Sequence, residues 1–210
     1  MAAKILAVAQ QKGGAGKTTI AVQLGVWWAC QGRKVALLDV DPQGSMKAWH
    51  GLRSEAGLDG SLSVSDVAGW KLSSEIDSLK RDNDLIIVDT PPHAETDARV
   101  AVRAAQLILV PVQPSPMDWW ATKPTLDMAA KEKTKFLLVL NRLPARGKLA
   151  DAIRAKIEAA GLPLAKASLG NRSAFAVSMM EGKGVAETQP KGTAAAEIEA
   201  LAKEIEKLIG

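Results

Sequence analysis

Cysteine is nearly absent from this chain of 210 residues, which contains one, Cys30. A single cysteine excludes an intrachain disulfide and any zinc or iron–sulfur cage built from the cysteines of one chain. Cys30 ends an apolar stretch of helical length, so we expect it to lie in the core. The cysteine content therefore gives no indication of an oxidising compartment.

Long apolar runs are missing as well. No stretch approaches the roughly 18 apolar residues of a membrane-spanning helix. The apolar run at residues 5–9 is too short for the core of a signal peptide. We therefore expect a cytoplasmic protein with no membrane partner.

The charges are nearly balanced, with 27 Lys and Arg residues against 23 Asp and Glu residues and a net charge of +4. Such a modest basic excess permits a polyanionic partner without requiring one. With 47% hydrophobic residues, the chain can bury one well-packed core. We predict a single domain that spans residues 1–210.

Short apolar runs alternate with longer amphipathic segments. The runs rich in Val, Ile and Leu, which are typical of strands buried on both faces, cover residues 5–9, 35–38, 85–88, 107–112 and 136–140. The segments of helical length cover residues 18–31, 95–105, 118–133 and 149–160, and a last packed helix is predicted near the end of the chain. This alternation predicts an α/β fold, a doubly wound and mostly parallel sheet with helices on both faces.

A glycine-rich loop, QQKGGAGKTT at residues 10–19, follows the first predicted strand. Its glycines allow backbone N–H groups to converge on phosphate oxygens, and the helix that follows adds its positive dipole end. Lys17 would reach the β- and γ-phosphates, while the Thr18 hydroxyl would bind Mg²⁺. The pattern G-x-x-x-x-G-K-[ST] is met except at its first position, where Gln11 replaces glycine. The predicted nucleotide-binding residues of the loop are Gly13, Gly14, Ala15, Gly16, Lys17, Thr18 and Thr19.

Three aspartates follow the next two strongly apolar runs, where ligands bind in sheets of this kind. Asp89 comes directly after residues 85–88 and is typical of a Walker B aspartate that holds Mg²⁺. Asp39 and Asp41 follow residues 35–38, and two carboxylates spaced i, i+2 beside a phosphate site suit a metal ligand and a water-orienting group. We assign Asp39 to the metal and Asp41 to the water.

Three motifs together resemble one protein family. They are KGGAGKTT at residues 12–19, DVDPQG at residues 39–44 and DTPP at residues 89–92. In this combination the sequence resembles the deviant Walker A ATPases of the ParA/MinD superfamily over essentially its whole length. The stretch PVQPSPMDWWA, residues 111–121, is most similar to the small ParA-type partition proteins. The resemblance implies a P-loop ATPase whose cofactors are ATP and Mg²⁺.

The resemblance also implies a use for Lys12, the extra lysine of the loop. In these families the lysine at this position reaches across an ATP-sandwich homodimer to the phosphates of the other subunit, so that dimerisation gates hydrolysis. It further implies a base-contacting role for Asn141, non-specific binding of nucleoid DNA by the ATP-bound dimer, and a ParB-like or adaptor protein that stimulates hydrolysis. The predicted catalytic residues are Lys12, Lys17 and Asp41.

Basic residues gather in the C-terminal third, where nine basic side chains stand against four acidic ones between residues 141 and 191. No helix-turn-helix, zinc-finger or aromatic RNA-binding signature accompanies them, so phosphate contact should dominate over base reading. Arg172 is the first candidate for a DNA contact because it stands in the polar turn GNRS without an acid at helical spacing. Lys183 and Lys191 come next. A solvated basic face without a ligand is the alternative.

Two other functions remain open. A MinD-like membrane ATPase would need a basic amphipathic helix at its C-terminus, and the segment from residue 197 onward carries four acids against two lysines. A P-loop metabolic ligase or kinase could use Lys12 as an ordinary loop residue and a small substrate in place of a second chain. The cargo of a positioning ATPase could be a plasmid, a chromosome region or a protein complex.

Two expectations concern single side chains. Asp118 is predicted to cap the helix that follows it. The adjacent pairs Trp27–Trp28 and Trp119–Trp120 are each predicted to have one partly exposed member, because neighbouring residues on a helix cannot both face one core.

Overall fold

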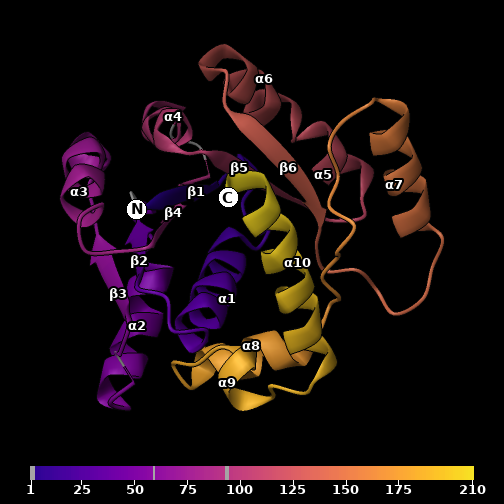
Figure 1. Cartoon of the computed structure of the whole chain (residues 1–210). Helices are drawn as coiled ribbons and strands as arrows, with labels where there is room; N and C mark the ends of the chain where they lie inside the picture. The colour runs from indigo at the N-terminus through magenta and orange to yellow at the C-terminus, as the bar shows by residue number, and fades with distance from the viewer. Residues whose placement is uncertain (1–2, 59, 93–94) are drawn as a thin grey trace.

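Six parallel strands form one sheet in the part of the chain that the structure describes. This computed structural model describes residues 3–58, 60–92 and 95–210. The strands are β1 (Lys4–Val8), β2 (Val35–Asp39), β3 (Leu62–Asp66), β4 (Leu85–Asp89), β5 (Leu107–Val112) and β6 (Lys135–Leu140). Their order is β3-β2-β4-β1-β5-β6, so β1 and β4 lie side by side at the centre of the sheet (Figure 1).

The register of the central strands brings the predicted site residues to one edge of the sheet. Val8, the last residue of β1, lies opposite Asp89, the last residue of β4. Asp39, the last residue of β2, also lies opposite Asp89. Because all strands run in one direction, the loops that leave their carboxyl ends meet above this edge, which is where open α/β sheets bind ligands.

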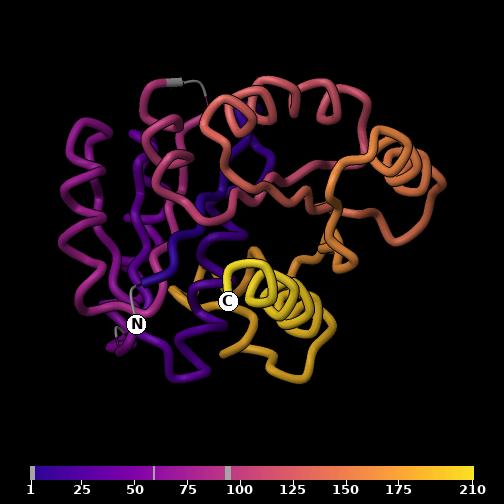
Figure 2. Tube along the Cα trace, turned by 45° about the horizontal axis from the view of Figure 1, so that its top comes forward, coloured from indigo at the N-terminus to yellow at the C-terminus, as the bar shows by residue number. Residues whose placement is uncertain are grey.

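Helices cover both faces of the sheet, as Figures 1 and 2 show. They are α1 (Lys17–Cys30), α2 (Ser45–Glu55), α3 (Leu72–Leu79), α4 (Glu95–Ala104), α5 (Pro116–Trp120), α6 (Lys123–Glu132), α7 (Leu149–Ala159), α8 (Ser173–Met180), α9 (Val185–Thr188) and α10 (Thr193–Ile209), with a 3-10 turn at Gly69–Lys71. The helices α1, α2, α8, α9 and α10 pack on one face, and α3, α4, α6 and α7 pack on the other. The predicted doubly wound α/β fold is confirmed.

The strand β3 lies outside the sequence prediction. Its sequence, LSVSD, contains three polar residues, and only Leu62 within it is buried. β3 pairs with β2 alone and forms an edge of the sheet. An edge strand is half-covered and needs no continuous apolar run, so it gives a weaker sequence signal than a central parallel strand.

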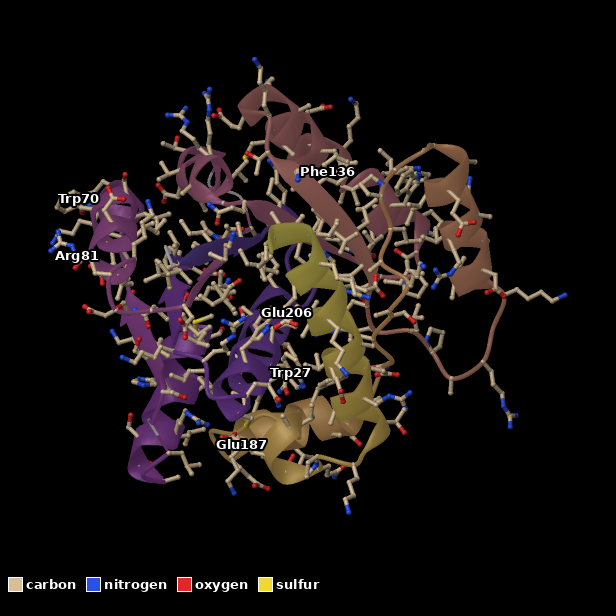
Figure 3. All side chains as sticks on the ribbon, viewed as in Figure 1. Trp27, Trp70, Arg81, Phe136, Glu187 and Glu206 are labelled. Atoms are coloured by element: carbon tan, nitrogen blue, oxygen red, sulfur yellow. The ribbon has the colours of Figure 1, made fainter. Side chains whose placement is uncertain are left out.

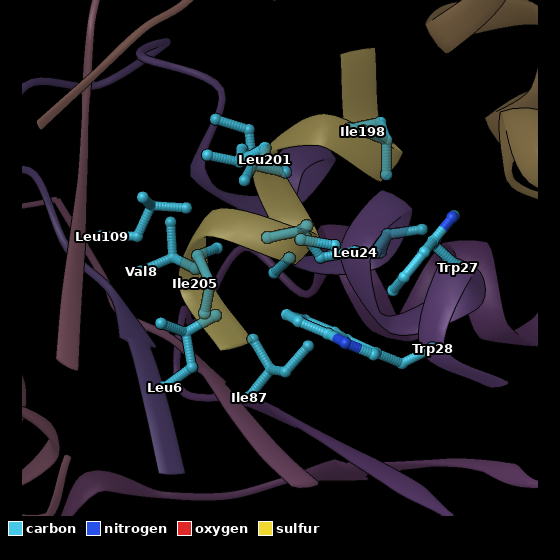
Figure 4. Packing of buried hydrophobic residues seen from close by; sticks show 14 of the residues in the cluster. Leu6, Val8, Leu24, Trp27, Trp28, Ile87, Leu109, Ile198, Leu201 and Ile205 are labelled. Atoms are coloured by element: carbon cyan, nitrogen blue, oxygen red, sulfur yellow. The ribbon is translucent and has the colours of Figure 1, made fainter. Parts of the chain in front are cut away.

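Side chains along each strand point alternately to the two faces. In β1, Leu6 and Val8 belong to the core under α1 and α10, whereas Ile5 and Ala7 belong to the core on the opposite face. Figure 4 shows the first of these cores, where side chains from α1 and α10 meet those of the central strands. The strand that leads into the glycine-rich loop is therefore held by apolar contacts on both sides.

Trp27 and Trp28 are both buried, with exposed fractions of 8% and 2%, so the prediction for this pair is wrong. The helix α1 packs against the sheet on one side and against α9 and α10 on the other. Neighbouring side chains on such a helix can pack against different partners, the sheet or the outer helices, so both can be buried. Trp28 Nε1 donates a hydrogen bond to Glu206 Oε1 at 2.9 Å, and Figure 3 shows Trp27 and Glu206 on the adjacent helices. In the second pair Trp120 is 65% exposed, as predicted.

Two further expectations need correction. Cys30 is exposed, because it is the last residue of α1 and lies beyond the part of the helix that the core covers. The single helix predicted at residues 118–133 is two helices, since α5 ends at Trp120 and α6 begins at Lys123 with a proline in its first turn. Within the described ranges, none of the helices combines the length and the apolar character needed to cross a membrane.

Candidate functional site

The glycine-rich loop connects β1 to α1, which packs on one face of the sheet. Gly14 and Gly16 have φ angles of +76° and +90°, a left-handed conformation that glycine adopts without strain. A Cβ atom at Gly16 would also lie 2.5 Å from Asn141 Nδ2. The loop therefore requires glycine at position 16 both for its backbone and for its close approach to the strand exit after β6.

Lys17 is the first residue of α1 and is 6% exposed. Burial lowers the pKa of its ammonium group, while the nearby carboxylates of Asp89 and Asp41 act in the opposite direction. The next residue, Thr18, donates a hydrogen bond through Oγ1 to Asp89 Oδ2 at 2.5 Å. The predicted lysine, threonine and Walker B aspartate thus converge beside the loop.

Asp89 is 1% exposed, and its other carboxylate oxygen, Oδ1, has no hydrogen-bond partner in the described chain. Burial raises the pKa of Asp89 to about 7, against the lowering effects of the Thr18 hydrogen bond and the Lys17 charge. A buried carboxylate oxygen without a partner is expensive unless a cation or proton satisfies it. The Thr18–Asp89 pair therefore fits a Mg²⁺ ion that is completed by phosphate and water. The described residues contain no cluster of three or more His, Cys, Asp or Glu that could hold a metal alone.

Asp39 and Asp41 lie on the same side of the loop but make different contacts. Asp39 accepts hydrogen bonds from the backbone N–H groups of Asp41, Met46 and Lys47, each at 3.2 Å. It thereby caps the start of α2, and burial raises its pKa. Both oxygens of Asp39 are engaged by backbone donors, so its metal-binding role stays a prediction. Asp41 Oδ1 accepts one backbone hydrogen bond, from Gln43 at 3.0 Å. Asp41 also lines a hollow beside the glycine-rich loop.

Two adjoining hollows lie above the loop. The first, here named the phosphate pocket, has a volume of about 310 Å³ and is lined by Gly13, Gly14, Gly16, Lys17, Thr18, Thr19, Asp41, Gln43, Ser45, Pro92, Arg142 and Met179. The second, here named the adjoining pocket, has a volume of about 150 Å³ and is lined by Gly16, Thr19, Asn141, Arg142, Gly170, Asn171, Arg172, Phe175 and Ala176. Gly16, Thr19 and Arg142 line both. A nucleotide has a phosphate tail and a base, and these hollows offer one place for each.

Asn141 is hydrogen-bonded to the glycine-rich loop. Its Nδ2 donates to the Ala15 carbonyl at 2.8 Å, and its Oδ1 accepts from the backbone N–H of Arg142 at 2.9 Å. Asn141 also lines the adjoining pocket. Asn141 is 6% exposed and both of its amide atoms are engaged within the chain, so its role as a base contact stays a prediction.

Lys12 is not among the residues that line the phosphate pocket. Its Nζ lies 2.5 Å from Asp118 Oδ2, and its side chain is 37% exposed while that of Asp118 is 4% exposed. Asp118 also accepts a hydrogen bond from Ser115 Oγ at 2.5 Å. The N-cap of α5 is Ser115, whose side chain accepts from the Asp118 N–H, so the predicted capping role of Asp118 is wrong. Asp118 instead binds the loop lysine.

Two of the three predicted DNA contacts are already paired within the chain. Arg172 binds Glu197 through two hydrogen bonds of 2.9 and 2.6 Å, and Lys183 pairs with Glu181 at 3.2 Å. Lys191 is exposed, and no ion pair forms at its side chain among the described residues. Glu197 is far from Arg172 in the sequence, so helical spacing could not reveal the pair.

Sequence reasoning missed Gln113 and the contact of Asp118 with Lys12. Gln113 Nε2 donates to the Gly14 carbonyl at 2.8 Å, and Gln113 and Asp118 both follow β5. β5 is the neighbour of β1, so its exit loop contacts the glycine-rich loop. The signal that could have found them is sheet order, which places the stretch after β5 beside the one after β1.

These features define a P-loop nucleotide-binding protein. Residues 6–185 match the family profile of the CobQ/CobB/MinD/ParA nucleotide binding domain. The chain is 34% identical over 203 residues to the maintenance of carboxysome distribution protein A of Halothiobacillus neapolitanus, with 91% of each chain covered. It is 34% identical over 134 residues to the chromosome-partitioning ATPase Soj of Thermus thermophilus, which covers 51% of this chain and 54% of that one. The solved structure of the cell division ATPase MinD of Pyrococcus furiosus has a TM-score of 0.80 at 25% identity, with 98% of this chain and 99% of that chain covered. This chain belongs to the ParA/MinD superfamily of P-loop ATPases.

Proposed function

We propose that this chain is a Mg²⁺-dependent ATPase that closes into an ATP-sandwich homodimer, binds DNA non-specifically in that state, and positions a cargo. The observation that carries the proposal is the separation of the two lysines of one loop. Lys17 is buried in the wall of the phosphate pocket, whereas Lys12 lies outside it on Asp118. A lysine that lies outside the pocket of its own chain supports a role toward the pocket of a second copy.

The nucleotide and the metal are assigned to the chain's own loop. Backbone N–H groups of residues 13–19 and the Lys17 ammonium group would hold the phosphates, and Thr18 and Asp89 would hold Mg²⁺. Bound Mg²⁺ supplies charge neutralisation at the β- and γ-phosphates. The unpartnered Oδ1 atom of Asp89 supports this assignment, and Asp39 contributes by fixing the start of α2 beside it.

Asp41 and Lys12 are assigned to hydrolysis. Asp41 borders the phosphate pocket with a carboxylate that accepts one backbone hydrogen bond, so it retains capacity to orient an attacking water. Lys12 from the other subunit would stabilise the charge that develops on the transferred phosphoryl group, as an arginine finger does. Hydrolysis then requires two chains, and a partner protein that stimulates it acts on the closed dimer.

Comparing the two lysines tests this division of roles. Lys17→Ala should abolish nucleotide binding, because it removes the buried charge of the cradle. Lys12→Ala should retain ADP binding, measured by titration calorimetry, but should remain monomeric in ATP by light scattering and lose turnover. A Lys12→Ala protein that dimerises and hydrolyses at the wild-type rate would make Lys12 a loop residue and favour a ligase or kinase with a small substrate.

DNA is the proposed partner of the closed dimer, and the nucleoid its site of association. Support comes from basic side chains of the C-terminal third that line neither pocket and form no ion pair among the described residues: Arg146, Lys148, Arg154, Lys156, Lys166 and Lys191. Such charges bind phosphates without reading bases. The match along 91% of a carboxysome-distribution protein, against 51% of this chain for the partition ATPase, favours a protein assembly as cargo, with an adaptor in the place of ParB.

Titration of random-sequence duplex DNA tests the DNA part. Binding should require ATP, disappear in ADP and weaken steeply with salt, with a log–log slope of about −0.9 per phosphate contact. Lys191→Ala should make the slope shallower by about two for a symmetric dimer. Lys203→Ala, which removes a lysine paired with Glu199 on α10, serves as the control. An ATP-bound dimer that ignores DNA at low salt would remove DNA from the mechanism and leave the ATPase intact.

A further inference from the structure

Arg142 is an unusual residue at the junction of the two pockets. It follows β6 and has a φ angle of +54°, in the left-handed region that residues other than glycine rarely adopt. Lys133 is the other described non-glycine residue with positive φ, and it is the C-cap of α6, where this conformation is common. Arg142 caps no described helix, so its backbone has no such local explanation.

The backbone of Arg142 is tied to the glycine-rich loop through Asn141. Asn141 Oδ1 accepts the Arg142 N–H at 2.9 Å while Asn141 Nδ2 holds the Ala15 carbonyl of the glycine-rich loop. One asparagine thus fixes both the loop and the turn that carries Arg142. An ideal Cβ at Gly16 would lie 4.0 Å from Arg142 Nε, so the guanidinium group extends over the loop.

The charge of Arg142 is available to a ligand. Across residues 3–58, 60–92 and 95–210, no acidic side chain lies within ion-pair distance of it. Arg172, which lines the same adjoining pocket, differs because its guanidinium is held by both oxygens of Glu197. Of these two arginines in the pocket wall, Arg142 alone has its charge uncompensated within the described chain.

We propose that Arg142 is a nucleotide-binding residue whose guanidinium group contacts the α-phosphate side of a nucleoside di- or triphosphate. This inference rests on the proposed nucleotide site. Arg142 lines both pockets, as Gly16 and Thr19 do, whereas Asp41 and Gln43 line the phosphate pocket but not the adjoining pocket. A nucleotide that has its phosphates on the loop and its base in the adjoining pocket passes beneath Arg142. Its planar fork can bind two phosphate oxygens at once.

Binding of Mg²⁺–ADP, measured by titration calorimetry, provides the test, because ADP carries the α-phosphate and does not form the sandwich dimer of the proposal. Arg142→Gly removes the guanidinium and suits the left-handed backbone. Its dissociation constant for ADP should rise about tenfold, as expected for loss of a charge-assisted hydrogen bond. The same factor should apply to a non-hydrolysable ATP analogue, since the contact does not involve the γ-phosphate. Arg142→Lys should recover part of the affinity through its charge.

Two control variants separate this effect from general ones. Lys133→Gly places glycine at the other left-handed position, and Arg146→Ala removes a positive charge from the same loop outside both pockets. Both should bind ADP within about twofold of the wild type. The melting temperature of Arg142→Gly should not fall, and Arg142→Asn, which tolerates the same φ, provides a second variant should the first fold poorly.

The outcomes separate the role of Arg142 from the existence of the nucleotide site. Wild-type ADP binding with an unchanged Arg142→Gly would overturn the role of Arg142 and leave the nucleotide site standing. A larger loss for the ATP analogue than for ADP would move the contact to the γ-phosphate and also overturn it. Wild-type protein that binds no nucleotide would overturn the proposed function together with this inference.

Discussion

The ammonium group of Lys12 lies 2.5 Å from the carboxylate of Asp118, which is 106 residues further along the chain. In the monomer this ion pair holds the lysine of the loop against α5 and away from the phosphate pocket. In the proposed mechanism, Lys12 acts on the other subunit only if this pair opens or rearranges when two chains meet. The contact would then oppose dimerisation.

Asp118→Asn should favour dimerisation, because asparagine keeps the shape but loses the charge that holds Lys12. A partly exposed pair of this kind is worth about 1 kcal/mol at most, so the dimer in ATP should form at roughly fivefold lower protein concentration. Light scattering over a concentration series measures this. Asp127→Asn, which removes the partner of exposed Lys123 on α6, is the matched control. Weaker dimerisation of Asp118→Asn would mean that Asp118 holds Lys12 in its active position instead.

Asp41→Ala should separate binding from hydrolysis. If Asp41 orients the attacking water, as proposed, its removal leaves the loop, Lys17 and Thr18 in place, so the variant should bind ATP and accumulate as the closed dimer. Single-turnover hydrolysis should slow by about a hundredfold. Asp66→Ala, at the end of β3 and outside the phosphate pocket, should hydrolyse normally. If Asp41→Ala fails to bind ATP, the residue is structural or a metal ligand.

Asp89 gives the free protein a pH-dependent stability. Its pKa is about 7 in the folded chain because of burial, and an unfolded aspartate titrates near 3.9. A group whose pKa is raised by folding stabilises the folded state, and this contribution is complete at pH values below its unfolded pKa. The contribution of Asp89 is therefore lost as pH rises from about 4 to about 7. The free energy of unfolding of the nucleotide-free wild type should therefore fall relative to Asp89→Asn over this range. A constant difference between the two proteins from pH 4 to pH 8 would contradict the prediction.

A buried ion pair outside the site joins α2 to α9. Arg53 is 4% exposed and binds Glu187 through two hydrogen bonds of 3.1 and 2.9 Å, and Figure 3 labels Glu187 beside this junction. Glu187→Ala leaves the guanidinium buried without its counter-charge, which should cost about 3 kcal/mol in the free energy of unfolding. Glu199→Ala, which breaks an exposed pair on α10, should cost less than about 0.5 kcal/mol. Urea titration measures the free energy of unfolding of both variants. Similar losses for the two would show that water solvates the Arg53 guanidinium once Glu187 is removed.

The central strands and the glycine-rich loop were predictable from the sequence because local patterns determine them. A buried parallel strand is a continuous apolar run, and the loop needs a fixed spacing of glycine, lysine and threonine. α2 and α8 were not predictable in this way. α2 has a mostly polar sequence and is fixed by Asp39 at its start, while α8 is apolar on several faces and exposes Val177 and Met180. Neither gives the one-sided pattern that marks a surface helix.

The contacts that change the interpretation of the site connect residues far apart in the chain. The Lys12–Asp118 pair depends on β5 lying next to β1, and the Arg172–Glu197 pair depends on α10 lying beside the turn after residue 169. The order of strands and the packing of α10 decide both. Residue type and spacing name the candidates, and only the three-dimensional arrangement shows which charges are already neutralised.

β1 and β4 are each hydrogen-bonded on both sides, β1 to β4 and β5 and β4 to β2 and β1. Strands in such positions exchange their amide protons only through the rarest openings of a protein. Asp89 ends β4, and Thr18 stands in the first turn of α1, which packs against both strands. The two groups assigned to the metal are therefore held by the centre of the sheet. A change of shape in the loops around the pocket would leave the distance between Thr18 and Asp89 unaltered. The positions of Thr18 and Asp89 would therefore be the same at the start of every hydrolysis cycle, whatever the loops did in the cycle before.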